Sequence, residues 1–184
     1  NVLPPYCVKP GTRAGRIAEL LCIRRISTEI CLKQLLTTNQ AVMSVVLNLF
    51  LSTSDEQSSL CLELLDVFCC LYDIGPGLTA EALEKVFKQR SPTAPLRQKY
   101  LKLIQLITST SMDLDHRFSA FTILAAVVDS FDDLTERFDA RLQLVSEGLN
   151  AQLKSLQSEP GLSTVNKMLV ERYEEEYAAD YAEM

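Results

Sequence analysis

The amino-acid sequence predicts an all-α fold, and three observations carry this prediction. The seven prolines fall at a few places and leave long proline-free blocks. These blocks are rich in Leu, Ala, Glu, Lys and Gln, which have high helix propensity, and their apolar residues recur at three- and four-residue intervals. No alternating run of Val, Ile and Thr bounded by tight-turn dipeptides indicates a strand.

Short polar breaks divide the chain into helical stretches. Residues 1–15 are an irregular lead-in, because paired prolines and a Pro-Gly turn oppose regular structure there. The predicted helices then cover residues 16–26, 29–36, 40–51, 56–72, 80–89, 96–108, 114–131, 134–156 and 164–184. We therefore expect a lead-in over 1–15, a helical domain over 16–159, and a C-terminal acidic helix or connector over 160–184.

The borders of the first four helices have local causes. The first two stretches separate near Ser27. Asn39 can cap the third helix, and Ser54 and Asp55 can cap the fourth, because these side chains accept hydrogen bonds from free N–H groups in a first turn.

In the second half, glycine and proline mark most borders. The Gly-Pro-Gly run at 75–77 is expected to end the fourth helix, and Thr79 to cap the fifth. The prolines within 91–95 precede the sixth helix, Gly148 interrupts the stretch 134–156, and Pro160 with Gly161 precedes the last helix.

The stretch 56–72 is the one around which the others are expected to pack. Its apolar residues at helical spacing are Leu60, Leu64, Val67, Phe68 and Leu71. Further Leu and Cys residues fill most of the remaining circumference. A helix that is apolar nearly all round must be covered on more than one side, so this sequence predicts a central helix.

Charge and hydropathy exclude several classes of function. The net charge is −6, and no clustered Lys and Arg surface that nucleic-acid phosphates require is apparent, so basic or apolar partners fit better. No apolar run reaches the roughly 18 residues of a membrane span. Residues 1–9 lack the basic start and apolar block of a signal peptide.

The six cysteines and the one histidine do not suggest a metal site. The cysteines lack paired Cys-x-x-Cys spacing, so zinc is not expected. Most lie on apolar helical faces, where a free thiol behaves as a small hydrophobe in a reducing compartment. We predict a cytosolic chain with reduced thiols and no cofactor.

Helical periodicity alone leaves open whether the helices form a bundle or a repeat solenoid. One pair of helices is informative: an apolar helix at 41–51, a Ser/Asp turn at 52–55, and a helix at 56–71 that opens with Glu-Gln and ends Leu-Leu-x-x-Phe. This pair resembles the second and third helices of an armadillo repeat. Solenoid packing would also explain why both helices are apolar nearly all round.

In series, the helical stretches resemble the armadillo-like regulatory region of formins, the diaphanous inhibitory region. Three blocks carry the resemblance: Leu62-Glu63-Leu64-Leu65-Asp66-Val67-Phe68-Cys69-Cys70-Leu71; Ala80-Glu81-Ala82-Leu83-Glu84-Lys85-Val86-Phe87 with the helix from Lys99 to Ile107; and Phe131-Asp132-Asp133-Leu134 through Arg137, Arg141 and Gly148-Leu149 to Leu153. Asn166-Lys167-Met168-Leu169 then leads into acidic residues, as in that family. The resemblance spans 16–184 and implies an armadillo-like helical repeat solenoid.

The formin resemblance implies autoinhibition as the function. In that family the concave surface of this domain binds an amphipathic helix with basic flanks from the protein's own C-terminus, and a Rho-family GTPase releases it. The match places the groove at Leu64, Val67, Cys70 and Leu71, with Glu63 as a charged neighbour. Core packing is the alternative for these residues, and it is favoured for Leu64 and Leu71.

The resemblance also implies further partners. Arg24, Arg25 and Lys33 are the candidate GTPase contacts, with a solvated helix face as the alternative. Actin is bound only through other domains of a formin, in the cytoplasm. The acidic run 171–183 is either a helical connector to a dimerisation region, implying a homodimer, or a frayed acidic end.

The sequence departs from the family in three respects. Asn residues usual in formins are absent at Ser27-Thr28 and near Ala125, and Val67 replaces a smaller residue. The segment that precedes this region in formins and contributes to GTPase binding is not recognisable in residues 1–15.

Two other classes of function are alternatives to the formin hypothesis. An armadillo- or HEAT-like adaptor outside the formins would bind a different peptide. An enzyme is not supported: His116 has Asp113 and Asp115 nearby, but no Ser or Cys is tied to it by sequence. Asp132 and Asp133 are paired carboxylates at a position where a helix N-terminus favours negative charge, so we assign them to capping.

Overall fold

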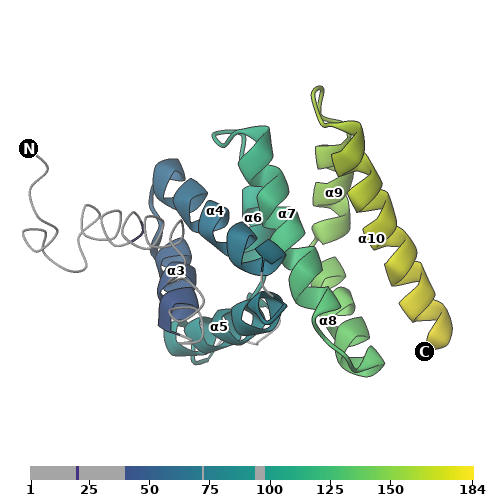
Figure 1. Ribbon diagram of the computed structural model, residues 1–184, viewed down its shortest axis with the longest axis horizontal. Coiled ribbons are helices and arrows are strands. Elements are labelled where there is room, and N and C mark those ends of the chain that lie inside the picture. The colour runs from purple at the N-terminus through teal and green to yellow at the C-terminus, as the bar shows by residue number, and fades with distance from the viewer. Residues whose placement is uncertain (1–19, 21–39, 72, 94–97) are drawn as a thin grey trace, which may run out of the picture.

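The computed structural model describes Leu20 and residues 40–71, 73–93 and 98–184. Within these ranges it is all-α, with eight helices and no strand (Figure 1). The predicted lead-in and the predicted helices before residue 40 lie outside the described residues, apart from Leu20. The helices are α3 (Gln40–Leu51), α4 (Asp55–Leu71), α5 (Gly75–Arg90), α6 (Leu101–Ile107), α7 (Leu114–Asp129), α8 (Leu134–Ser146), α9 (Leu149–Gln157) and α10 (Thr164–Glu183).

Helix α4 is covered on several sides, as its sequence predicts. It packs against α3, α5 and α7, and Cys61, Leu62, Leu64, Leu65 and Phe68 are all buried. The remaining helices follow along the chain: α7 also contacts α6 and α8, and α10 closes the far end against α8 and α9 (Figure 1). One hydrophobic core runs through this arrangement from α3 to α10.

The border between α4 and α5 corrects one prediction. The Gly-Pro-Gly run was expected to lie between the two helices, but α5 begins at Gly75, with Pro76 in its first turn. Proline is tolerated there because its missing N–H would have no partner in the helix. Thr79 is not a cap: it is buried within α5, and its hydroxyl donates to the Gly75 carbonyl at 2.9 Å.

The sixth and eighth helices also differ in their bounds from the prediction. Helix α6 begins at Leu101, not near residue 96, and Tyr100 is its N-cap. The stretch 134–156 forms two helices, because Gly148 adopts φ 96° between α8 and α9. Glycine reaches this left-handed conformation without steric cost, so the predicted interruption is confirmed.

Acidic and hydroxyl side chains cap several helices. The Asp133 carboxylate accepts from the Glu136 N–H at 3.0 Å, which confirms capping for Asp133, while Asp132 is exposed beside it. Asp113 and Ser163 cap α7 and α10 in the same way. These bonds satisfy N–H groups that a helix start otherwise leaves without partners.

The acidic C-terminal stretch forms a packed helix. Asp180 of α10 is buried and accepts from Arg137 Nη2 at 3.0 Å and from Arg141 Nε at 2.7 Å, both on α8. Tyr173 packs edge-on against Phe121 of α7, with ring centroids 5.6 Å apart. Arg137 and then Arg141 hold the pKa of Asp180 below its ordinary value. Together these contacts fasten α10 to the rest of the fold.

Hydropathy gives no sign of a bilayer-crossing helix. Across the ranges described, every helix is too short or too polar to span a membrane.

Candidate functional site

The predicted groove residues lie along α4 and differ in exposure. Val67 is half-buried, Cys70 is exposed and Glu63 is half-buried, whereas Leu64 is only 1% exposed. Leu64 is therefore a core residue, the alternative favoured by the sequence. Leu71 ends α4, and its side chain lies outside the described residues.

Polar side chains of α7 join the accessible edge of α4. Thr122 Oγ1 donates to Asp66 Oδ1 at 2.9 Å, and His116 Nε2 lies 3.4 Å from Glu63 Oε1. The two helices thus present one continuous surface, which we call the α4–α7 surface. It consists of Glu63, Asp66, Val67 and Cys70 on α4 and of His116 and Thr122 on α7.

Carboxylates border the apolar centre of the α4–α7 surface. Asp113, the cap of α7, lies beside His116 with 2.7 Å between Oδ1 and Nδ1. The backbone N–H of His116, and then its ring, hold the pKa of Asp113 below its ordinary value. Glu63, Asp66 and Asp113 give this edge an acidic character, and the half-buried Val67 lies on the same side of α4 as Glu63 and Asp66.

The thiols of α4 are not set up as nucleophiles. Burial raises the pKa of both Cys61 and Cys69 to about 12. Burial and the neighbouring Asp66 carboxylate also raise the pKa of Cys70. Because the thiolate is the reactive form, these cysteines remain protonated near neutral pH and serve as small apolar groups.

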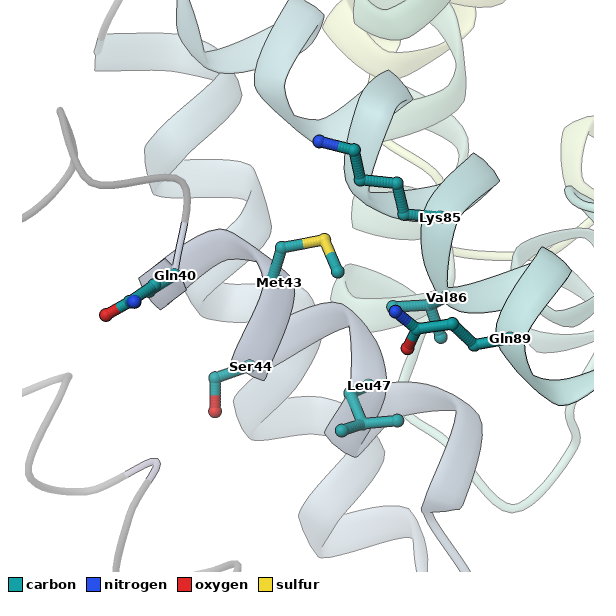
Figure 2. Close-up of a pocket in the computed structure, with 7 residues that line it drawn as sticks. All are labelled: Gln40, Met43, Ser44, Leu47, Lys85, Val86 and Gln89. Carbon is teal, nitrogen blue, oxygen red and sulfur yellow. The ribbon is translucent and has the colours of Figure 1, made fainter.

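A pocket that the sequence did not indicate lies between α3 and α5 (Figure 2). Its volume is about 400 Å³, and Met43, Leu47 and Val86 supply its apolar lining. In Figure 2 the side chain of Met43 lies between the two helices, with Val86 and Gln89 facing it from α5. Met43 and Leu47 stand one turn apart on α3. That spacing is the signal in the sequence that could have indicated the pocket.

The three candidate GTPase contacts cannot be placed on the α4–α7 surface or in this pocket. Arg24, Arg25 and Lys33 lie outside the described residues, so their assignment stays a prediction. Within the described ranges, no three His, Cys, Asp or Glu side chains come together as metal ligands.

A separate cluster of titratable groups lies where α8 meets the turn before α6. Burial raises the pKa of Glu147 to about 7, although the Gln143 amide donates to its Oε1 at 2.8 Å. Lys99 lies nearby, with Nζ 4.8 Å from the centre of the Tyr100 ring, and burial lowers its pKa. The Glu147 carboxylate is thus held where ionisation costs free energy.

Glu147→Gln should make the domain more stable at alkaline pH. A carboxyl group with a pKa raised on folding is favourable when protonated, so stability should fall as pH rises from about 4.5 to about 7. The variant removes that fall. Because the carboxyl is only half-buried and partly screened by water, the gain at pH 8 should be roughly 2 kcal/mol, less than the full pKa shift implies, with little change at pH 4. Urea unfolding at both pH values measures this. Asp139→Asn, at an exposed carboxylate of α8, is the control, and an equal gain there would contradict the prediction.

The comparisons with known proteins add no family. No protein-family model, no curated protein and no solved structure matches this chain.

Proposed function

We propose that this chain is the regulatory domain of an actin-nucleating formin. In this proposal it holds the amphipathic helix from the C-terminus of its own protein on the α4–α7 surface, which silences actin assembly. A Rho-family GTPase releases that helix, and the protein acts in the cytoplasm at the actin cytoskeleton. The proposal rests on the resemblance of the sequence to formins and on the accessible side of α4.

The observation that carries the proposal is the composition of the α4–α7 surface. Val67 and Cys70 leave apolar area accessible on α4, with Glu63 and Asp66 on the same side of the helix and Asp113 beside His116 of α7. An amphipathic helix with basic flanks matches both features: its apolar side would cover Val67, and its basic residues would meet the carboxylates. Excluding water from that apolar area supplies affinity, and the charges supply selectivity.

The order of the helices supports an armadillo-like solenoid. Helices α3, α4 and α5 contact one another, α4 and α5 contact α7, α6 and α7 contact α9 and α8, and α10 contacts α8 and α9. Each group therefore packs mainly on the next one along the chain, which is how repeat proteins build a continuous core. In this arrangement α4 is an inner helix with one side left to a partner.

Val67→Asp should weaken binding of the C-terminal helix at least tenfold, about 1.4 kcal/mol, while the domain stays folded. The substitution places a charge in the apolar centre of an already acidic surface. Fluorescence anisotropy with a basic amphipathic peptide from the same protein measures affinity, and circular dichroism checks the fold. Leu142→Asp, at an exposed apolar residue of α8, is the matched control and should bind normally.

Two results would count against this placement. Unchanged binding by Val67→Asp would move the partner away from α4, and loss of the fold would make Val67 a core residue. Titration with a GTP-loaded Rho-family GTPase tests the release step, and it should compete with the peptide. A domain that binds neither ligand would rule out the formin function and favour an adaptor for another peptide.

A further inference from the structure

The outer face of α10 carries apolar residues that no helix of the described chain covers. Its inner face is fixed by Val170, Tyr173 and Asp180, which are all buried. On the opposite face Val165 is 65% exposed and Met168 is 61% exposed, beside a hollow of about 520 Å³. In Figure 1, α10 forms the right-hand edge of the molecule, with its outer face directed away from the other helices.

The outer face follows a heptad pattern with two unlike halves. Positions spaced alternately by three and four residues are all exposed: Val165, Met168, Arg172, Glu175, Ala179 and Ala182. The first two are large and apolar, the last two are small, and the middle two carry opposite charges. This spacing is that of a coiled-coil seam, in which large side chains of one helix enter holes of another.

The same face is complementary to itself in one antiparallel register. Two copies of α10 related by a two-fold axis between positions 173 and 174 would place Met168 against Ala179 and Val165 against Ala182. Arg172 of each copy would then meet Glu175 of the other, so two ion pairs form at the centre. In such an isologous contact both copies contribute the same patch, so the dimer is closed and does not extend into a filament.

Other pairings of the two helices lose the charge match. An antiparallel register shifted by one heptad sets Arg172 against Met168 and Glu175 against Val165, or else both charges against alanines. A parallel pair sets Arg172 against Arg172. Arg172 also donates to Glu176 of its own helix at 2.7 Å, but its side chain is 72% exposed and its guanidinium has further N–H donors.

We propose that the outer face of α10 binds a second copy of this chain as an antiparallel helix pair. The contact lies on α10, away from the α4–α7 surface, and does not depend on the function proposed for that surface. Because four of its six seam positions are alanine or charged, the dimer should be weak and should form reversibly with concentration.

Sedimentation equilibrium from about 1 µM to about 500 µM should show a shift from monomer toward dimer. Arg172→Glu alone, and Glu175→Arg alone, should each weaken association at least tenfold, because like charges then meet at the centre. The double variant carrying both changes should recover it, since the charges are exchanged on both copies. Arg90→Glu, at an exposed Arg of α5, makes the same charge change elsewhere and should dimerise normally.

Three outcomes would overturn the proposal. These are a monomer across the whole concentration range, a dimer that neither single reversal weakens, and a double variant that fails to recover association. Circular dichroism of each variant establishes that the helices are retained, so a loss of dimer is not a loss of fold.

Discussion

Gly75→Ala is expected to destabilise the domain by about 3 kcal/mol or more. A Cβ at this position would lie 1.8 Å from the carbonyl oxygen of Phe68 and 2.6 Å from its carbonyl carbon. Both are backbone atoms of α4, so no side-chain rotation can relieve the overlap. Helices α4 and α5 would have to separate, and chemical denaturation would measure the loss.

Gly77→Ala is the matched control for that experiment. Its added Cβ would meet no atom within 4 Å, and the residue lies within α5. Alanine in an open helical position should therefore stabilise the domain by about 0.5–1 kcal/mol. If both variants lost stability equally, the close approach at Gly75 would not be the cause. Because Gly75 abuts the end of α4, its variant should also bind the C-terminal peptide less tightly.

Asp180→Ala is expected to cost about 3 kcal/mol and to loosen α10. The variant removes the carboxylate that Arg137 and Arg141 share and leaves Arg141, which is 1% exposed, with weaker partners. The nearest of these are Asp129 at 3.2 Å and Glu176 at 3.7 Å. Denaturant unfolding reports the total loss, and limited proteolysis within α10 reports local release.

The pH dependence provides an independent readout for Asp180. Its folded pKa is lowered, so its contribution is present above the ordinary value of 3.8 and is lost as pH falls through the folded pKa. The cost of Asp180→Ala should therefore shrink in strong acid. Glu174→Ala, at an exposed carboxylate of the same helix, should lose little stability at any pH. A large loss in that control would contradict the role of the arginine contacts.

The bounds of a helix could be predicted from the local sequence where a single residue type determines where the helix begins or ends. The helix over Gln40–Leu51 has the predicted bounds, and Gly148 interrupts the next-to-last stretch as expected. The border at Gly75 could not be predicted in this way. A Gly-Pro-Gly run is compatible with the end of one helix or the start of the next, and the close approach of Gly75 to the Phe68 carbonyl is a contact between elements that the local sequence does not reveal.

The candidate site could be predicted only in part, because contacts between helices are not visible in the local sequence. Hydrophobic spacing placed Leu64 and Val67 on α4 and favoured the core for Leu64, but it left open whether α3, α5 and α7 would cover Val67. Likewise the bond between Thr122 and Asp66 joins residues 56 apart in sequence, so no local pattern reveals it. Asp180 is 43 residues from Arg137 and 39 from Arg141 in the sequence, so no local pattern could predict these pairings either.

The bond from Thr122 to Asp66 has a consequence for how selective the α4–α7 surface can be. Asp66 already accepts a hydrogen bond at Oδ1 at 2.9 Å, so a basic residue of an incoming partner would be left the remaining acceptor sites of a carboxylate that Thr122 already holds. Because that basic residue gives up its own hydrogen bonds to water, the exchange yields little net free energy. A partner lacking the basic residue loses little affinity, while one with an acidic residue there meets repulsion. Charge at this edge should therefore act mainly by rejecting acidic competitors.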